Sequence, residues 1–565
     1  MSSKLQLTTL AVLVSAALPA QAALYKVVEV APGVTGNEAY GTAIQPSDEA
    51  LNTSNPLGCF DSGASSATCE GYKLAGETRN RPDGFSYREE VPFAMDNSFG
   101  YIEDDYDGFE DYCFYQLGYA TCEYWASDRW SSWSNETYGS NTPNSLAFIE
   151  GSAEKPSGAI NTVINSLDPS GQPVGNFSTS SKRNEAFSVV TNSTLTSKAQ
   201  SRAWASDGTY TVGSTSSKSG IGGERYYYSS APAIWSSSGF VSIPRAGGYE
   251  VDDDYYAQGS MRDFYIDSTG GKTYGVGYNN YSDQHMNATI FIGNSATLTS
   301  ATWSSELIYN AQVDISGDNI HSNSVATNIN KNLVVVGQAK RSGGFPQNGA
   351  ASNRLFVVPD VSSPEAKFLD ELSSAKSIFF DGAGGEMGGI NNFNEIVGRV
   401  DSENHREYDG KQRRQRAFIY PYDVKGTIAT RRNIFKDKRD DKVKAWLLDD
   451  LTNGGSESSN NNQYRIYDAS DINDAGVISA TAVKCDGGYD STAHNAYCGE
   501  GNKDETVVAV KLVPIALKKD VEGKPITDIQ PRGEESTATE RKGAGLGFGA
   551  LTILGLFGFM RKRIK

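Results

Sequence analysis

A short segment recurs three times in the second half of the chain, and this repeat limits the folds that the chain can adopt. In each copy an Ile-Asn pair leads through a polar turn of Asn, Asp or Gly into an apolar run rich in Val and Ile. A polar tight turn followed by β-branched residues predicts a β-hairpin. The copies are ATNINKNLVVVG, GGINNFNEIVG and ASDINDAGVISA, at 326–337, 388–398 and 469–480.

More strands are predicted around each copy, so the repeating unit holds several strands. Each copy is followed by an apolar strand, and two copies are preceded by another. The following strands are RLFVV, RAFIY and TVVAV at 354–358, 416–420 and 506–510, and the preceding ones are FLDEL and WLLDDL at 368–372 and 446–451. The first half carries fainter echoes at 39–46, 145–149, 185–190, 272–277 and 288–292.

Successive copies are 61 and then 82 residues apart, and polar insertions at 403–416 and 454–462 account for the drift. A repeat that cannot bury its own apolar face must stack on its neighbours. Multi-stranded units of this length favour an all-β repeat architecture of the β-propeller kind over a solenoid. Aromatic residues at 11% and 58 glycines agree with strands joined by tight turns. An ordinary β-sandwich with coincidental hairpins remains the alternative.

The N-terminus has the three parts of a secretory signal peptide. Lys4 supplies positive charge, an apolar stretch follows, and Ala20-Gln21-Ala22 offers small residues for cleavage. The apolar stretch is shorter than the roughly 20 residues that a permanent N-terminal anchor needs. The sequence therefore predicts a signal peptide over 1–22 and a body facing the outside of the inner membrane, in the periplasm or on the cell surface.

The C-terminus predicts a membrane anchor. Residues 543–560 carry no charge, and a basic cluster at 561–565 follows at once. Such a stretch is just long enough for a transmembrane helix, and the basic residues should stay cytoplasmic. The alternative, a buried core helix, is disfavoured because the chain ends directly after it. We expect the 23–517 body to be joined to this helix by a flexible linker at 518–542, which has few large apolar residues.

The net charge of the chain is −17. Removing Lys4 with the signal peptide and the four terminal basic residues deletes five positive charges and leaves −22 on the exported body. A body of this charge should repel nucleic acid, so no nucleic-acid partner is expected. The charge also serves solubility, which is the simpler explanation for it.

Six cysteines form three sequence-local pairs. In an exported chain an even number of cysteines predicts disulfides, and pairing of nearest neighbours is the simplest of the 15 arrangements. No C-x-x-C spacing is present, which argues against a zinc or redox site. The pairs are Cys59 with Cys69, Cys113 with Cys122, and Cys485 with Cys498.

The repeat resembles the extracellular repeat named for its His-Ala-Phe strand. The closest matches are Gly389-Ile390-Asn391, Ile396-Val397-Gly398 and Ala417-Phe418-Ile419, with Arg416 in place of the histidine. The tail resembles Gly-Gly-type C-terminal sorting signals, which rhomboid-like sorting proteases cleave, although Gly543-Ala544-Gly545 lacks adjacent glycines. With Ala23-Leu24-Tyr25 at the expected mature start, the chain resembles a family of exported Gram-negative bacterial proteins of unknown function. That resemblance implies no activity.

No catalytic motif stands out among the four histidines, and no thiol nucleophile is left once the cysteines are paired. One candidate metal site is the alternation Glu103, Asp105 and Asp107 before Gly108, which presents hard oxygen ligands as a calcium loop does. The spacing does not complete an EF-hand, and a solvated acidic loop is the simpler interpretation. Calcium is the one cofactor considered, and the catalytic residues stay unknown.

These observations favour a non-enzymatic, envelope-anchored module that binds a protein or glycan ligand. The competing hypothesis is an extracellular glycan hydrolase that uses two carboxylates on the central face of the propeller. Two carboxyl groups close together in an axial pocket would favour the hydrolase, whereas an axis filled by a loop would favour binding.

Overall fold

The computed structural model describes residues 23–47, 55–82, 87–89, 105–111, 113–114, 119, 121–137, 143–154, 158–220, 226–248, 251–252, 255–282, 285–311, 324–340, 353–405 and 413–535. The predicted signal peptide at 1–22, the helix at 543–560 and the basic tail at 561–565 lie outside these ranges. Within the ranges, no helix combines the length and the apolar character needed to cross a membrane.

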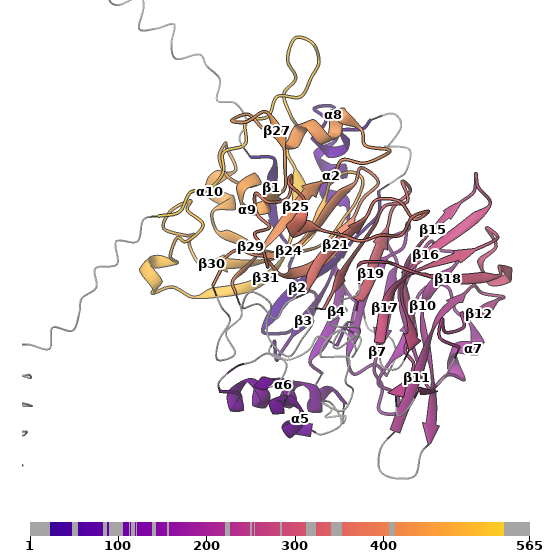
Figure 1. Ribbon diagram of the computed structural model, residues 1–565. Coiled ribbons are helices and arrows are strands. Elements are labelled where there is room, and N and C mark those ends of the chain that lie inside the picture. The colour runs from indigo at the N-terminus through magenta and orange to yellow at the C-terminus, as the bar shows by residue number, and fades with distance from the viewer. Residues whose placement is uncertain are drawn as a thin grey trace, which may run out of the picture.

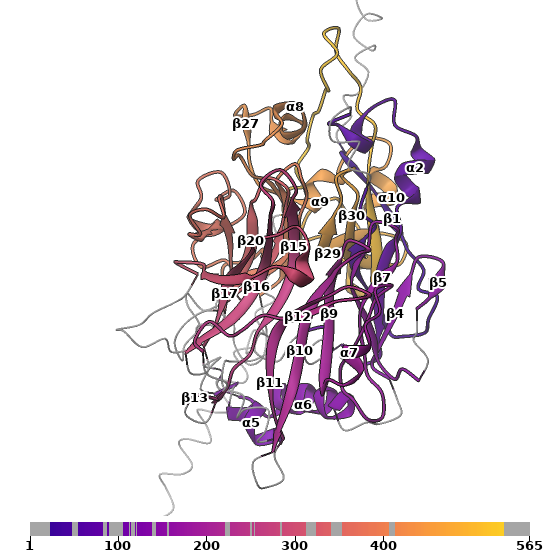
Figure 2. The same ribbon diagram turned by 90° about the vertical axis from the view of Figure 1, so that its right-hand side faces the viewer.

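Seven antiparallel sheets are arranged as the blades of a β-propeller (Figures 1 and 2). Six blades have four strands and one has three, and we number them 1 to 7 along the chain. The first strand of each blade lies at the centre of the ring. The prediction of an all-β propeller is confirmed, and the β-sandwich alternative is wrong.

Blades 1 to 4 come from the first half of the chain. Blade 1 consists of β2 (Glu38–Ile44), β3 (Leu74–Arg79), β4 (Ser145–Ile149) and β5 (Ser152–Ala153). Blade 2 consists of β6 (Thr162–Leu167), β7 (Pro173–Phe177) and β8 (Glu185–Phe187). Blade 3 consists of β9 (Gln200–Ser206), β10 (Thr211–Gly220), β11 (Tyr226–Trp235) and β12 (Phe240–Ser242). Blade 4 consists of β15 (Ser260–Asp267), β16 (Lys272–Ser282), β17 (His285–Gly293) and β18 (Trp303–Leu307).

Blades 5 to 7 contain the three copies of the repeat. Blade 5 consists of β19 (Ser324–Ile329), β20 (Val335–Ala339), β21 (Arg354–Val358) and β22 (Lys367–Phe368). Blade 6 consists of β23 (Gly385–Ile390), β24 (Glu395–Asp401), β25 (Gln415–Pro421) and β28 (Trp446–Leu447). Blade 7 consists of β29 (Tyr464–Ile472), β30 (Ile478–Cys485), β31 (Glu505–Pro514) and β1 (Tyr25–Glu29).

Each copy of the repeat is the hairpin between the first and second strands of a blade, as the sequence predicts. The FLDEL and WLLDDL segments begin with the fourth strands of blades 5 and 6.

The remaining elements are short and lie between or beside the blades. They are α2 (Ser66–Gly71), α5 (Asp105–Asp111), α6 (Glu123–Thr137), α7 (Ser193–Thr196), α8 (Ala429–Arg432), α9 (Leu448–Leu451), α10 (Ser458–Asn461), η1 (Gly58–Phe60), η3 (Leu298–Ser300), η4 (Leu369–Glu371), η5 (Asn433–Phe435), η6 (Gly499–Gly501) and the strand pairs β13 (Val251–Asp252) with β14 (Tyr255–Tyr256) and β26 (Lys436–Asp437) with β27 (Lys442–Val443).

The N-terminal strand closes the ring. β1 pairs antiparallel with β31, from Tyr25 opposite Pro514 to Glu29 opposite Val510, and becomes the outer strand of blade 7. Figure 1 shows β1, in indigo, among the orange and yellow strands of the C-terminal blades. Because the last blade takes a strand from the start of the chain, opening the ring requires breaking a complete β ladder.

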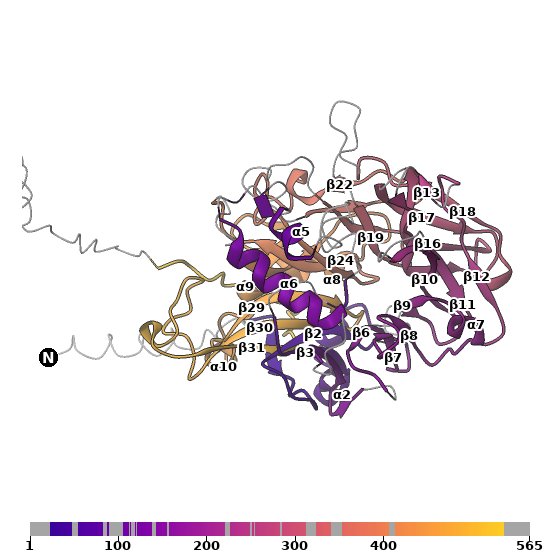
Figure 3. The same cartoon turned by 90° about the horizontal axis from the view of Figure 1, so that it is seen from below.

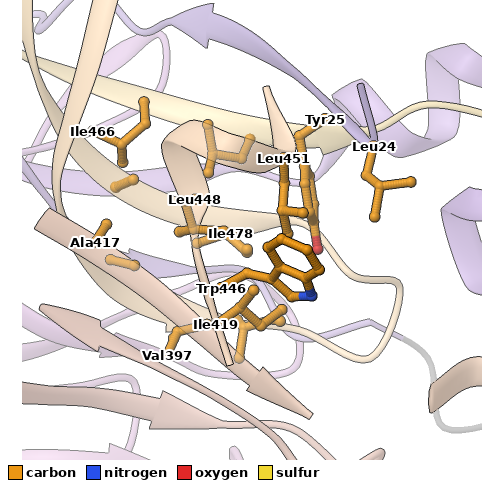
Figure 4. Close-up of a cluster of buried hydrophobic side chains, with 14 of the residues drawn as sticks. Leu24, Tyr25, Val397, Ala417, Ile419, Trp446, Leu448, Leu451, Ile466 and Ile478 are labelled. Atoms are coloured by element: carbon orange, nitrogen blue, oxygen red, sulfur yellow. The ribbon is translucent and has the colours of Figure 1, made fainter. Parts of the chain in front are cut away.

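Apolar side chains fill the space between each pair of neighbouring blades. A separate buried cluster joins blades 1 and 2, 2 and 3, and so on around the ring to 7 and 1. The largest joins blades 6 and 7, where Trp446 packs with Ile419, Leu448 and Ile478 (Figure 4). The hydrophobic core is therefore a ring of inter-blade layers, as stacking of repeats requires.

Part of the segment predicted to be a flexible linker packs against the rest of the body. Arg532 is 5% exposed, and its side chain donates hydrogen bonds to the Asp449 backbone oxygen at 2.8 Å and to Asn462 Oδ1 at 3.0 Å. Thr527 and Ile529 are buried as well. Residues 518–524, by contrast, are exposed, and 536–542 lie outside the described residues.

Candidate functional site

A β-bulge in the innermost strand of every blade turns one residue toward the propeller axis. In each case the pairing with the second strand skips that residue, which is left out of the ladder. Bulges re-aim a side chain without ending the strand. The skipped residues are Thr42, Asn165, Trp204, Arg262, Thr327, Gly388 and Ser470 in blades 1 to 7.

All seven bulged residues line one cavity at the axis, with a volume of about 280 Å³. Gly388 contributes backbone only, because a Cβ there would lie 2.0 Å from the Ala469 backbone oxygen of the next blade. Most of the other side chains in the wall are polar as well, so the cavity is predominantly polar. The seven blades thus form a single polar cavity of small-molecule size.

Two residues of the β3–β4 connection, Arg88 and Glu89, line the cavity at the axis. Arg88 donates to Asn165 Oδ1 at 3.2 Å and to the Thr42 backbone oxygen at 3.4 Å, and its own backbone oxygen accepts from Arg202 at 3.0 Å. Glu89 lies beside it in the cavity wall. Inner strands of blades 1 to 3 therefore hold this segment in place, and it brings both a guanidinium and a carboxylate to the axis.

The same connection covers one face of the molecule. α5 and α6 lie below the blades in Figure 1, and they cross the central region when the molecule is viewed from below (Figure 3). Cys113 and Cys122, which flank the link between these helices, form a disulfide. The rings of Tyr106 and Trp130 meet edge to face at 6.4 Å. The connection thus forms a stapled cap on that side.

Two axial carboxylates bridge neighbouring blades. Asp263 of blade 4 accepts a hydrogen bond from the backbone N–H of Ile329 in blade 5 at 3.0 Å. Asp471 of blade 7 accepts from the backbone N–H of Ile44 in blade 1, also at 3.0 Å. Burial raises the pKa of Asp263 to about 7 and raises the pKa of Asp471, although the backbone donors oppose it.

A second group of carboxylates surrounds one arginine. Glu386 forms an ion pair with Arg399, whose guanidinium also donates to the Tyr467 hydroxyl at 2.9 Å. Burial raises the pKa of Glu89 and of Asp468, and the negative charge of Glu386 raises both further. Burial acts to lower the pKa of Arg399, but Glu386, Tyr467, Asp468 and Glu89 together outweigh it, so the pKa is raised. The cavity therefore places an ion-paired carboxylate near two that hold their protons more strongly.

The predicted calcium ligands lie elsewhere. Asp105 and Asp107 are in α5, and Glu103 is outside the described residues. Among the residues that the structure describes, no group of three His, Cys, Asp or Glu side chains is arranged to hold a metal ion. With one of its three ligands not described, the calcium site stays a prediction.

The three predicted disulfides are present. Cys59 bonds to Cys69, Cys113 to Cys122 and Cys485 to Cys498, with Cα–Cα distances of 5.6–5.8 Å. The first ties the β2–β3 connection, the second the cap and the third the β30–β31 connection. All three join residues 9 to 13 positions apart in the sequence.

Sequence reasoning missed the axial carboxylates, although part of the signal was present. At two of the three copies, the residue before the Ile-Asn pair lines the cavity, namely Asn328 and Asp471. These positions are hard to assign from the sequence, because the bulge interrupts the alternation of side chains between the two faces of the sheet. Glu89 carried no signal, since it lies in the long connection rather than in the repeat.

The comparison with family models bears on the fold just described. A family model described as "Protein of unknown function (DUF3466)" matches residues 252–563.

The chain belongs to this family.

The match begins at β13 and takes in blades 4 to 7, so the three copies of the repeat lie within it. The predicted membership of a family of unknown function is thereby confirmed. No curated protein matches the chain. A β-propeller in a family of unknown function fits a binding or interaction module, and the family description assigns no activity.

Proposed function

We propose that the chain is an extracytoplasmic, envelope-anchored β-propeller that binds a small polar ligand in its axial cavity. The observation that carries this proposal is the convergence of seven bulged residues, one from each blade, on one polar cavity. Bringing carboxylates into the interior costs folding free energy, and such groups are typical of sites that act on or bind something. A pocket with a few convergent polar groups is the usual form of a small-molecule site.

The proposed location rests on separate observations. Three disulfides are expected where the surroundings are oxidising, as they are outside the inner membrane. The sequence adds a signal peptide at 1–22 and an uncharged stretch at 543–560, with a sorting protease as the expected partner of the tail. Mass spectrometry of the protein from fractionated envelopes tests this location. A chain in the cytosol with residues 1–22 attached would contradict it.

The ligand-binding proposal can be tested with full-length protein and a cavity-filling variant. Ligand-observed NMR would screen a mixture of small sugars, amino acids, amines and dicarboxylates. Thr327 lines the cavity, and its hydroxyl makes one hydrogen bond, to the Val336 backbone oxygen at 3.3 Å. Thr327→Phe should place a ring in the cavity and abolish binding, whereas Thr209→Phe on an exposed turn should not. Absence of binding by every solute, or binding that survives Thr327→Phe, would contradict the proposal.

A second candidate function is glycan hydrolysis by paired carboxylates. It is favoured by the raised pKa values of Glu89 and Asp468 beside the ion-paired Glu386, because a glycosidase needs one protonated and one ionised carboxyl group. Incubation with aryl glycosides tests it. Product that disappears in both Glu89→Gln and Asp468→Asn would favour hydrolysis, and product that persists in both would exclude these residues.

A further inference from the structure

We infer that the ligand of the axial cavity is a small organic cation that carries an amino group. This inference rests on the proposed binding function and adds the chemical class of the ligand. It is built on the charges of the cavity wall, on one polar atom there that has no partner, and on the size of the cavity.

Carboxylates outnumber guanidiniums in the cavity wall. Five acidic side chains line it, and only two arginines do. The acidic residues are Glu89, Asp263, Glu386, Asp468 and Asp471. Acidic groups thus outnumber basic ones in the wall, and a bound cation would favour their ionised form over the protonated form that burial favours.

The arginines of the wall are already engaged. Arg88 is bonded to the inner strands of blades 1 and 2, as described above. The guanidinium of Arg262 lies 3.5 Å above the ring centre of Trp204. This stacking covers one face of Trp204, which lines the cavity, so that face is closed to a sugar ring. A neutral sugar would therefore find less stacking surface and would not favour the ionised form of the acidic groups.

Neither Glu89 nor Asp468 forms an ion pair within the described residues, although arginines lie near both and act to lower their pKa values. Among the described residues, no Lys, Arg or His nitrogen lies within 4.0 Å of a carboxylate oxygen of Glu89 or Asp468, whereas Glu386 has Arg399. An ammonium group has three N–H donors and no acceptor, and it would supply both charge and hydrogen bonds to this pair.

Thr42 provides an independent sign of a missing ligand. It is the bulged residue of blade 1, lines the cavity and is 3% exposed. Its hydroxyl oxygen is buried and has no hydrogen-bond partner within the described part of the chain. A buried hydroxyl without a partner costs about 1–3 kcal/mol, and an N–H donor from a ligand would satisfy it.

Size and geometry narrow the class further. A cavity of about 280 Å³ is at the lower end of small-molecule sites, which suits a compact amine. A bare metal ion is disfavoured, because within the described ranges no three acidic, His or Cys side chains are placed to coordinate one.

The test compares three four-carbon probes that differ only in their end groups. Calorimetry with the full chain near pH 7 would use 1,4-diaminobutane, 1,4-butanediol and succinate, with calcium chloride as a fourth arm. We expect saturable binding of the diamine, with affinity at least about tenfold above the other three. Binding should also release protons, because a cation lowers the raised pKa values of the wall carboxyls, so the measured heat should vary with the buffer.

Variants separate a ligand contact from a structural role. Asp468→Asn should weaken diamine binding about tenfold, whereas Asp381→Asn, whose parent side chain is 85% exposed, should leave it unchanged. Thr42→Val removes the unpartnered hydroxyl, so it should weaken binding while the unfolding midpoint without ligand stays the same or rises.

Each other outcome has a distinct meaning. Binding of the diol, of succinate or of calcium as tightly as the diamine would overturn the ligand class and leave the binding function standing. Failure of all four probes, while the solute mixture yields a ligand that carries no amino group and is excluded by Thr327→Phe, would overturn the ligand class alone. Failure of the mixture as well would overturn the proposed function.

Discussion

The residue that begins the turn after the inner strand differs between blades 5 to 7 and blades 2 to 4. In blades 5 to 7 the turn after the inner strand begins with Asn330, Asn391 or Asn473, and in blades 2 to 4 with Asp168, Asp207 or Asp267. The side-chain oxygen caps its own turn in both groups. Asn330 accepts from the backbone of residues 332 and 334, and Asp168 accepts from 170 and 172.

Only the asparagines also reach the next blade. The side-chain N–H₂ group of Asn330 donates to the Asn391 backbone oxygen at 2.9 Å, that of Asn391 to Asn473 at 3.2 Å, and that of Asn473 to Gln45 at 3.0 Å. A carboxylate has no N–H to donate. The apolar layers differ as well, with 15 buried residues between blades 5 and 6 and six between blades 2 and 3. One end of the repeat array is thus more tightly cross-linked than the other.

The strongest expected effect comes from the buried ion pair at the cross-linked end. Arg431 and Glu395 are each 1% exposed and 2.7 Å apart, and Arg431 also donates to the Leu57 backbone oxygen. Arg431→Leu leaves a buried carboxylate unpaired and should lower the free energy of unfolding by about 3–5 kcal/mol. Lys376→Met, at an exposed pair, should cost less than about 1 kcal/mol. Urea denaturation measures the free energy of unfolding of both variants. Equal losses in the two would show that the buried ion pair contributes no more to stability than the exposed one.

The disulfides test whether the cap is part of the ring. Cys485–Cys498 staples a blade, so replacing both cysteines with serine should cost about 3 kcal/mol in unfolding of the ring. The same change at Cys113 and Cys122 should cost the ring less than about 1 kcal/mol, because that disulfide lies in the cap. Thermal unfolding followed by near-ultraviolet circular dichroism distinguishes the two. A larger loss from the cap disulfide would mean that the cap holds the blades together.

An exchange of the two turn residues tests the comparison directly. Asn330→Asp keeps the cap of its own turn but loses the donor to blade 6, and it should cost about 2–3 kcal/mol because the Asn391 oxygen is left without that bond. Asp168→Asn keeps the corresponding cap and should change stability by less than about 0.5 kcal/mol. Chemical denaturation of both variants is the measurement. Similar costs would show that the amide cross-links contribute little.

The free energy of unfolding should also depend on pH, through Asp263. Because the pKa of Asp263 is about 7 in the folded chain and lower when unfolded, the folded state holds the proton longer. The free energy of unfolding should therefore fall as the pH rises from about 4 to about 7 and level off above that. Asp263→Asn should reduce this slope by about 1 kcal/mol per pH unit, because it removes the proton that Asp263 takes up on folding. A parallel slope in the variant, from denaturation at several pH values, would assign the effect to other groups.

The second half of the fold was predictable from the sequence because the structure requires an Ile-Asn pair at the same point of each blade there. Ile-Asn marks the end of an inner strand, and the asparagine is required both for the turn and for the next blade. In the first half the aspartate serves only its own turn, so other residues satisfy the position and the repeat fades. The N-terminal closure by β1 was not predicted, because pairing with β31 joins segments almost 490 residues apart.

The candidate site was less accessible to prediction. Local spacing drew attention to Glu103, Asp105 and Asp107, whereas the cavity takes single residues from seven separate strands. Only the ring geometry brings Asp263 and Asp468 to one axis. Charged residues that are brought together only by the tertiary structure leave no local pattern in the sequence. The bulges also interrupt the alternation of inward-facing and outward-facing side chains that would otherwise reveal them.

An axial cavity that is lined by carboxyl groups and binds small cations is the central claim, and thiol labelling tests it most directly. Thr327→Cys would be labelled with trimethylammonioethyl and with sulfonatoethyl methanethiosulfonate, and Thr209→Cys on the exposed turn would serve as the reference. The excess of carboxyl groups predicts a ratio of cationic to anionic labelling rates at least about tenfold higher at 327 than at 209. Equal ratios at the two positions, or no labelling at 327 in the folded protein, would contradict the account.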